Sequence, residues 1–448
     1  TQKKDITYMD RDSYGGIPIY FSNKIQFATT EFDVIIKLLN PKSSSVNISA
    51  MSEYLSASYI TNGKTLYKDI SWLLPYQTLS FKKKIFSINN KKIFPSFHFS
   101  DEKKVSNYLD QSINNSLSDF VKRFTGPVTI NLSGGTDSTL LFAKIRELQP
   151  NKKILTNTYF HSDWRKDLND WKYAELASKK FKSDHKLINI TNQKFCRNHF
   201  EYLKKIKHVS HTFASSFYLQ NKNNTKFPIL NGSGPDESII GTEKIPIKDL
   251  LNLRNLPKNF WDKNLIEDID YLKLSEKNIK KYLLKKYRSK VNFVNNRLSI
   301  ASELKESKNF VEFQRRYHAV TVLQDHILEI SQVGSVIGRP IIFPYLTQDI
   351  FNIIFSTPFE ILNKNGVYKS IIKKLLERYI DKNFVNRPKI GFQAPSRPYF
   401  AKKNGLGGSM NNLLKVNNSK FFDLLCLKDA VTDRIENSSN IFKRYDFL

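Results

Sequence analysis

The stretch VTINLSGGTDSTLLFAKI, Val128 to Ile145, decides the fold of this chain. Its first part alternates apolar residues at Val128, Ile130 and Leu132, which predicts a buried strand. Its last part spaces apolar residues as a helix does. The Ser-Gly-Gly-Thr-Asp-Ser turn therefore leads from a strand into a helix N-terminus, where backbone N–H groups bind anions. The stretch predicts an α/β unit with an anion site at the turn.

The composition of this turn suits the pyrophosphate of a nucleotide. Gly134 and Gly135 let the backbone approach a ligand closely, and Ser133 and Ser138 can add hydroxyl donors. Asp137 suits an anion site only if a cation binds too, and Mg²⁺ between a carboxylate and phosphates would explain it. A Gly-Gly turn alone is usually just a tight connection. The whole string is more specific, and it lacks the Gly-Lys-Ser/Thr of a Walker loop.

A second motif, FPILNGSGPDESIIG, covers Phe227 to Gly241 and again runs from an apolar strand to a glycine-rich turn. Gly232 and Gly234 open the turn, and Asp236 and Glu237 follow it. Such an acidic pair is by itself most often a favourable charge at a helix N-terminus. Its combination with the first turn is what favours a functional interpretation.

Together the two motifs resemble the asparagine synthetase family of N-type ATP pyrophosphatases, which cleave ATP to AMP and pyrophosphate. The resemblance implies an adenine nucleotide alpha hydrolase-like fold, with ATP and Mg²⁺ as cofactors. It further implies that Mg²⁺ is bound by Asp137 and Asp236. The residues that it implies for nucleotide binding are Leu132, Ser133, Gly134, Gly135, Asp137, Ser138, Gly232, Ser233 and Gly234.

A C-terminal block, Gly366 to Pro395, is similar to the same family. It ends in an Arg-x-Lys-x-Gly-Phe turn, formed here by Arg387, Lys389, Gly391 and Phe392. The resemblance implies that Lys389 reaches the phosphates and the acyl-adenylate. Lys389 is thus the predicted catalytic residue.

The N-terminal part resembles the end of the family's glutaminase domain, at Arg11 to Tyr20, and the segment that follows it, at Met51 to Leu79. Residues 1–97 are therefore interpreted as a β-rich remnant of an N-terminal nucleophile glutaminase-like domain plus a linker, and residues 98–448 as the ATP-pyrophosphatase domain. The sequence begins with Thr1 instead of a nucleophilic cysteine, and its two cysteines lie in the second part. Most of the glutaminase domain would then be truncated, lost or supplied by a separate polypeptide.

Two departures from the family distinguish this chain. Ser233 replaces a glutamate between the two glycines, and the segment Pro340 to Thr347 lacks the family's acidic and basic partners around its Pro-aromatic-Leu core. These changes favour a specialised amide-forming relative, such as a lasso-peptide cyclase or a β-lactam synthetase. The expected substrates are a small-molecule or peptide carboxylate and an amine, with a biosynthetic protein as a possible partner.

Three alternatives stay open. The chain could make asparagine from ammonia or glutamine, with its glutaminase part truncated or supplied separately. It could be a tRNA-modifying ligase with the same pyrophosphate loop, although the match at Arg387 to Phe392 argues against that. It could also be a non-catalytic subunit of a biosynthetic complex, against which the intact Asp137, Asp236 and Lys389 argue.

Composition limits the remaining function classes. The 448 residues carry a net charge of +29, but the lysines are spread along the chain, so we interpret them as solvated faces and do not expect a nucleic-acid partner. Two cysteines fit a reducing compartment. No apolar run approaches ~18 residues, so we expect a cytoplasmic protein without a membrane partner.

The pattern of elements predicts an α/β fold with a parallel sheet flanked by helices, a helical C-terminal part and a small β-rich N-terminal part. Because ligands bind at the carboxyl ends of such strands, both motifs should share one site. The roles of His208, His211 and Tyr345 are left open. The expected strands are 17–21, 26–29, 128–132, 153–159, 186–190 and 228–231, and the expected helices are 108–123, 138–148, 169–182, 195–208 and 211–221, with a helical pattern from about 257 onward.

Overall fold

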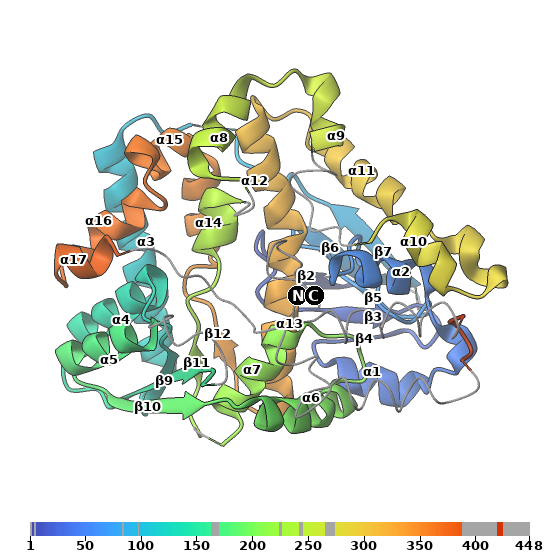
Figure 1. Cartoon of the computed structure of the whole chain (residues 1–448), viewed down its shortest axis with the longest axis horizontal. Coiled ribbons are helices and arrows are strands. Elements are labelled where there is room, and N and C mark those ends of the chain that lie inside the picture. Colours follow the sequence, from blue (N-terminus) through green and yellow to red (C-terminus); the bar gives the residue numbers. More distant parts are fainter. Residues whose placement is uncertain are drawn as a thin grey trace.

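The computed structural model in Figure 1 describes residues 2–3, 6–82, 85–96, 98–162, 170–223, 226–241, 245–264, 274–387 and 419–423. Its centre is a five-stranded sheet in the order β10-β9-β8-β11-β12, and all of its neighbouring strands are parallel. The strands are β8 (Val128–Asn131), β9 (Ile154–Phe160), β10 (Asp184–Asn189), β11 (Ile229–Leu230) and β12 (Ile341–Ile342).

Helices cover this sheet on both faces (Figure 1). One group packs around α4, and the other packs around α7, which contacts β9 and α13. The first group consists of α3 (Glu102–Arg123), α4 (Thr136–Leu148), α5 (Asp170–Phe181) and α16 (Ser370–Leu376). The second consists of α6 (Asn192–Ile206), α7 (Thr212–Asn221) and α13 (Val322–Ile337). The predicted fold class is confirmed.

Between β8 and β11, the observed strands and helices agree closely with those that the sequence predicts. Two other elements, α3 and β12, differ from the prediction. Helix α3 begins earlier than expected, because the Asp101 carboxylate caps it by accepting hydrogen bonds from the N–H groups of Lys103 and Lys104. Strand β12 interrupts the region expected to be helical. It pairs with β11, and Ile341 lies beside Ile229. Because it is only two residues long, the sequence shows no hydrophobic periodicity that would predict it.

The N-terminal part forms two antiparallel sheets, on the right in Figure 1, in the orders β1-β2-β6-β7 and β4-β3-β5. The strands expected at 17–21 and 26–29 are present as β3 and β4. The hairpin of β6 and β7 was not predicted. The elements are β1 (Gln2–Lys3), β2 (Ile6–Asp10), β3 (Tyr20–Ser22), β4 (Phe27–Thr29), α1 (Phe32–Leu39), η1 (Ser43–Ser45), α2 (Ile48–Ala57), β5 (Ser71–Trp72), β6 (Gln77–Lys82) and β7 (Ile85–Asn90). The division of the chain at residue 97 stays a prediction.

The rest of the described chain is mainly helical. A continuous apolar core joins the sheet to α3, α4, α12, α13, α14 and α16, and burial of its side chains is the main source of stability. No helix within the described ranges is both long and apolar enough to cross a bilayer. The remaining elements are the π-helix η2 (Asp236–Ile240), α8 (Ile247–Asn252), η3 (Leu253–Asn255), η4 (Lys258–Phe260), α9 (Trp261–Asn264), α10 (Glu276–Tyr282), η6 (Lys285–Lys290), α11 (Phe293–Glu303), α12 (Phe310–Val320), α14 (Gln348–Phe355), α15 (Phe359–Leu362), η7 (Lys364–Gly366) and α17 (Lys382–Val385).

Candidate nucleotide site

The two glycine-rich motifs lie side by side at the carboxyl end of the parallel sheet. Strands β8 and β11 are neighbours, so the turns that follow them emerge at the same edge. A Cβ at Gly232 would lie 3.0 Å from the backbone nitrogen of Ser138, in the other turn. Glycine at position 232 therefore allows the two turns to touch, and one ligand can contact both.

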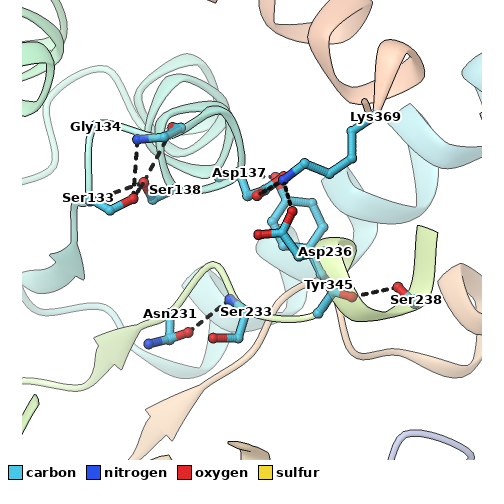
Figure 2. Close-up of polar contacts among 12 residues, drawn as sticks. Ser133, Gly134, Asp137, Ser138, Asn231, Ser233, Asp236, Ser238, Tyr345 and Lys369 are labelled. Atoms are coloured by element: carbon cyan, nitrogen blue, oxygen red, sulfur yellow. Dashed lines mark hydrogen bonds and ion pairs between the residues drawn. The ribbon is translucent and has the colours of Figure 1, made fainter. Parts of the chain in front are cut away.

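The first turn is held in shape by its own hydroxyl groups (Figure 2). The Ser133 N–H donates to the Ser138 hydroxyl at 3.2 Å, and the Gly135 N–H donates to the Ser133 hydroxyl at 3.2 Å. Gly134 adopts φ +76°, and a Cβ there would lie 2.5 Å from the Asp170 carbonyl oxygen. The turn is thus a backbone-lined loop at the start of α4, the arrangement that binds phosphate oxygens.

Two carboxylates and one ammonium group converge beside this loop. Figure 2 shows the Asp137 and Asp236 side chains pointing toward the end of Lys369. The Lys369 ammonium forms ion pairs with both carboxylates and lies 2.6 Å from the Asp236 oxygen. Only 5% of the Lys369 side chain is exposed, so this charge is held away from bulk water.

The donor set at this point fits a divalent cation. Carboxylate oxygens are the ligands that Mg²⁺ prefers, and two of them already surround a single positive charge. The Lys369 ammonium takes the place that a cation between Asp137 and Asp236 would have. The residues predicted for Mg²⁺ are therefore together, although their role as ligands stays a prediction.

Lys369 and Asp137 are fixed through their backbones. Lys369 lies in the left-handed region, at φ 50°, directly before α16, and its N–H donates to the buried Asn363 side chain at 2.9 Å. The Tyr345 hydroxyl donates to the Asp137 carbonyl oxygen at 2.9 Å. Tyr345 is buried, so it is a core residue that also contacts the loop.

The second turn is also ordered by local bonds. The Ser233 N–H donates to the Asn231 side-chain oxygen at 2.9 Å, and the Ser238 hydroxyl donates to the Gly234 carbonyl at 2.6 Å. Asp236 begins a single π-helical turn, an irregularity often found at functional sites. Next to it, Glu237 lies 2.9 Å from the His326 Nδ1. Burial would raise the pKa of the Glu237 carboxyl, but the bond from His326 outweighs it and lowers that pKa.

Further positive charges surround the loop. The Arg387 guanidinium lies 2.5 Å from the Asp170 carboxylate, donates to the Gly134 carbonyl at 2.6 Å and stacks 4.2 Å from the Tyr173 ring centre. Burial, together with the charges of Lys369 and Arg387, lowers the pKa of Lys373. The mutual repulsion of these cations favours an anionic ligand among them.

The predicted residues are brought together to different extents. All of the loop and turn residues predicted for the nucleotide meet at this edge of the sheet, whereas Lys389, Gly391 and Phe392 lie outside the described residues. The sequence reasoning missed Lys369. The sequence did contain a signal for Lys369, because this residue belongs to the C-terminal block that resembles the family. Its contact with Asp137, 232 positions away, is visible only in the folded structure.

The two histidines considered as substrate contacts have structural surroundings. The buried His208 accepts the Leu66 N–H at Nε2 (3.3 Å), and burial lowers its pKa to about 4. His211 caps α7, where its side chain accepts the Phe213 N–H at 3.4 Å. A substrate role for either residue stays a prediction.

A parallel sheet with a glycine-rich loop and converging carboxylates at its carboxyl end is the arrangement of an α/β protein suited to bind a nucleotide. Residues 108–443 match the asparagine synthase family, so the chain belongs to that family. It is similar to asparagine synthetase (glutamine-hydrolyzing) 1 of Bacillus subtilis (strain 168), with 21% identity, covering 99% of this chain and 74% of the relative. Family membership makes the chain, at the general level, an ATP-dependent carbon–nitrogen ligase.

A search of solved structures finds the U34-tRNA thiolase NcsA from Methanococcus maripaludis. The two chains share 10% identity with a TM-score of 0.28, and the match covers 76% of this chain and 81% of the thiolase. A similarity at this level identifies neither the substrate nor the reaction.

Proposed function

We propose that this protein is an AMP-forming amide ligase that activates a substrate carboxylate with ATP and transfers the acyl group to an amine, in specialised peptide or small-molecule biosynthesis. The observation that carries this proposal is the cluster of Asp137, Asp236 and Lys369 beside a pyrophosphate-type loop. Macrolactam closure in a peptide is one reaction of this kind.

The first step forms an acyl-adenylate. A carboxylate oxygen attacks the α-phosphorus of ATP, and the bond from that phosphorus to the bridging oxygen breaks to release pyrophosphate. The N–H groups of the Ser133 to Ser138 loop bind the pyrophosphate, and Lys373 and Arg387 supply positive charge around them. Such fixed donors stabilise charge that develops in the transition state.

Asp137 and Asp236 would hold Mg²⁺ at this site. When bound, the ion would neutralise phosphate charge and polarise the phosphoryl oxygens. Because Lys369 already pairs with the same carboxylates, we propose that its ammonium moves toward the phosphates when the metal binds.

The second step transfers the acyl group. The amine attacks the acyl carbon, AMP leaves with the oxygen that linked it to that carbon, and the amine nitrogen releases a proton. Lys389 is proposed to stabilise the oxyanion of the tetrahedral carbon. Holding both reactants in one pocket supplies much of the rate.

A second candidate function is asparagine synthesis. It is favoured by the similarity to the Bacillus subtilis asparagine synthetase, which spans almost the whole of this chain. The exchange of the family glutamate for Ser233, and the loss of charged partners in Pro340 to Thr347, favour the specialised ligase instead.

Product analysis separates these functions. Purified protein is incubated with Mg²⁺ and α-labelled ATP, together with either aspartate and ammonium or peptides that carry a free amine and an acidic side chain. We expect AMP and pyrophosphate, a peptide product lighter by one water, and no asparagine. Asparagine formation would favour the second candidate, and ADP as the sole nucleotide product would refute AMP-forming chemistry altogether.

A further inference from the structure

A small cavity lies where α13 packs against the N-terminal part of the chain. Its volume is about 10 Å³, which is about the space that one water molecule needs. No residue of the nucleotide site lines it. Its walls come from α13, from the segment Ile60 to Thr65, from Tyr20 and Tyr54, and from the turn at His208.

Two residues that line this cavity, Glu329 and Gln332, each carry an oxygen atom that lacks a hydrogen-bond donor among the described residues. Asp325 and Glu329 are one helical turn apart on α13, and both line the cavity. One Glu329 oxygen accepts the His211 N–H, and the Ser210 hydroxyl also interacts with this carboxylate, whereas the second oxygen has no hydrogen bond of normal geometry among the described residues. Asp325 is half-buried, so its carboxylate can also be reached by water. Buried acceptors of this kind require a proton, water or cation.

Gln332 provides an independent, uncharged acceptor one turn further along α13. Only 7% of Gln332 is exposed, and it also lines the cavity. Its amide nitrogen donates to the Tyr20 hydroxyl at 3.5 Å, which leaves its carbonyl oxygen without a donor in the described part of the chain. Three side chains on one face of α13 therefore line a space the size of one water, and two of them carry a buried oxygen without a donor among the described residues.

The nearby Arg297 and Lys64 side chains form ion pairs with a different acid, although the charges of His326 and Arg297 also act on Asp325. Glu53 lies 3.6 Å from the Arg297 guanidinium and 3.5 Å from the Lys64 ammonium. His208 is held neutral, since its Nδ1 donates to the Val209 carbonyl while its Nε2 accepts an N–H. Among these described residues, the three acids Glu53, Asp325 and Glu329 exceed the two bases Arg297 and Lys64 by one. Other titratable groups near this part of α13 in the described ranges include Tyr20, Tyr54, Tyr59, Tyr202, His211, His326 and Glu237.

We infer that this cavity binds one dehydrated monovalent cation of the size of K⁺ or NH₄⁺, held by the oxygen atoms of Asp325, Glu329 and Gln332, in exchange for a proton. Either ion is close to a water molecule in size. Mg²⁺ fits the site poorly, because it keeps several waters for which there is no room. The described residues contain no group of three or more His, Cys, Asp or Glu side chains suited to a metal.

The exchange with a proton gives the site a pH dependence. At low pH the acid pair holds a proton, which supplies the missing charge without a cation. At higher pH the proton leaves, and the cation becomes the favourable partner of the buried carboxylates. Because the cation binds the folded chain, it should raise the unfolding temperature only at the higher pH.

The test uses the full chain and thermal unfolding, so it needs no substrate. Unfolding is followed at pH 5 and pH 8 in KCl, NH₄Cl, NaCl or LiCl, with choline chloride keeping the ionic strength constant. We expect KCl or NH₄Cl to raise the midpoint by about 2 °C or more over choline chloride at pH 8 and to have no effect at pH 5. The comparison of KCl with NH₄Cl identifies which ion the site prefers.

Three variants locate the effect. Glu329→Gln keeps an oxygen for the His211 N–H but removes the charge, and Gln332→Leu removes the neutral ligand; both should abolish the ion-specific shift. Glu201→Gln, which alters a carboxylate on α6, is the matched control and should retain the shift. Crystals grown with Rb⁺ or Tl⁺ should show an anomalous peak between Asp325 and Glu329. Equal midpoints in all salts, or an ion-specific shift that survives in Glu329→Gln, would overturn the inference.

Discussion

The nucleotide site and the α13 cavity both gather carboxylates, but they balance the charge in different ways. At the nucleotide site the Lys369 ammonium lies between Asp137 and Asp236. At the cavity no base in the described residues lies within ion-pair distance of Asp325 or Glu329, and burial raises the pKa of both, although the charges of His326 and Arg297 oppose this for Asp325. A fixed ammonium compensates the charge of clustered acids, whereas buried acids without one favour a proton or a cation as the partner.

The largest effect is expected for Lys389→Ala. If Lys389 stabilises charge in the transition state, single-turnover product formation should slow by at least ~100-fold, and an interaction of this kind contributes ~3–4 kcal/mol. Nucleotide affinity should change by no more than a few-fold. The control is Lys382→Ala, which alters an exposed lysine on α17. Turnover by Lys389→Ala close to that of the control would remove the catalytic assignment.

Removal of the ammonium at the nucleotide site should convert that site into one that resembles the cavity. Lys369→Met leaves Asp137 and Asp236 facing each other without a cation, and the loss of one partner from a buried ion pair costs about 3 kcal/mol of unfolding free energy. Mg²⁺ should restore more stability in this variant than in the wild type. Urea unfolding with and without Mg²⁺ measures both effects.

Lys364→Met is the matched control, because Lys364 pairs with Glu102 but is 56% exposed. An exposed pair contributes little, so the control should lose at most ~1 kcal/mol. Equal losses in the two variants would show that Lys369 is an ordinary surface charge.

A smaller effect is expected for Asp137→Asn. The substitution keeps the size of the side chain but removes one carboxylate from the proposed metal site. The dissociation constant of Mg·ATP should rise about tenfold, or ~1.4 kcal/mol, while binding of metal-free ATP should weaken less. Titration calorimetry with and without Mg²⁺ distinguishes the two. Asp119→Asn, on an exposed position of α3, should bind like the wild type. If the affinities for metal-free ATP and for Mg·ATP fall by a similar factor, a role for Asp137 in metal binding would be contradicted.

The two regions also differ in how far the sequence predicts them. The strand, turn and helix of Val128 to Ile145 are local, because apolar spacing and glycines report directly on backbone shape, and both glycine-rich turns lie where the pattern places them. Strand β12 was missed because two residues have no period. Lys369 was missed because its function depends on contacts with Asp137 and Asp236, which the sequence does not encode locally. The cavity was missed for the same reason.

The smallest expected effect concerns the pH dependence of stability. Burial raises the pKa of Asp325 to about 7, and burial together with the charge of Asp325 raises that of Glu329. Both values lie above those near 4 expected in the unfolded chain. The stabilising contribution of each proton is therefore complete below about pH 4, and it is lost as the pH rises toward the folded-state values. In choline chloride, without K⁺ or NH₄⁺, the wild-type chain should become less stable between pH 5 and pH 8 because of this pair.

Glu329→Gln should behave in the opposite way to Lys369→Met at pH 8. The substitution removes an uncompensated acid but retains the oxygen that accepts the His211 N–H. The free energy of unfolding of the variant should therefore exceed that of the wild type at pH 8. At pH 5 the two proteins should be equally stable. Urea unfolding at intervals between pH 5 and pH 8 measures the difference. A variant that is less stable than the wild type at pH 8 would mean that Glu329 is ionised and paired in the fold, and that the contrast between the two regions does not hold.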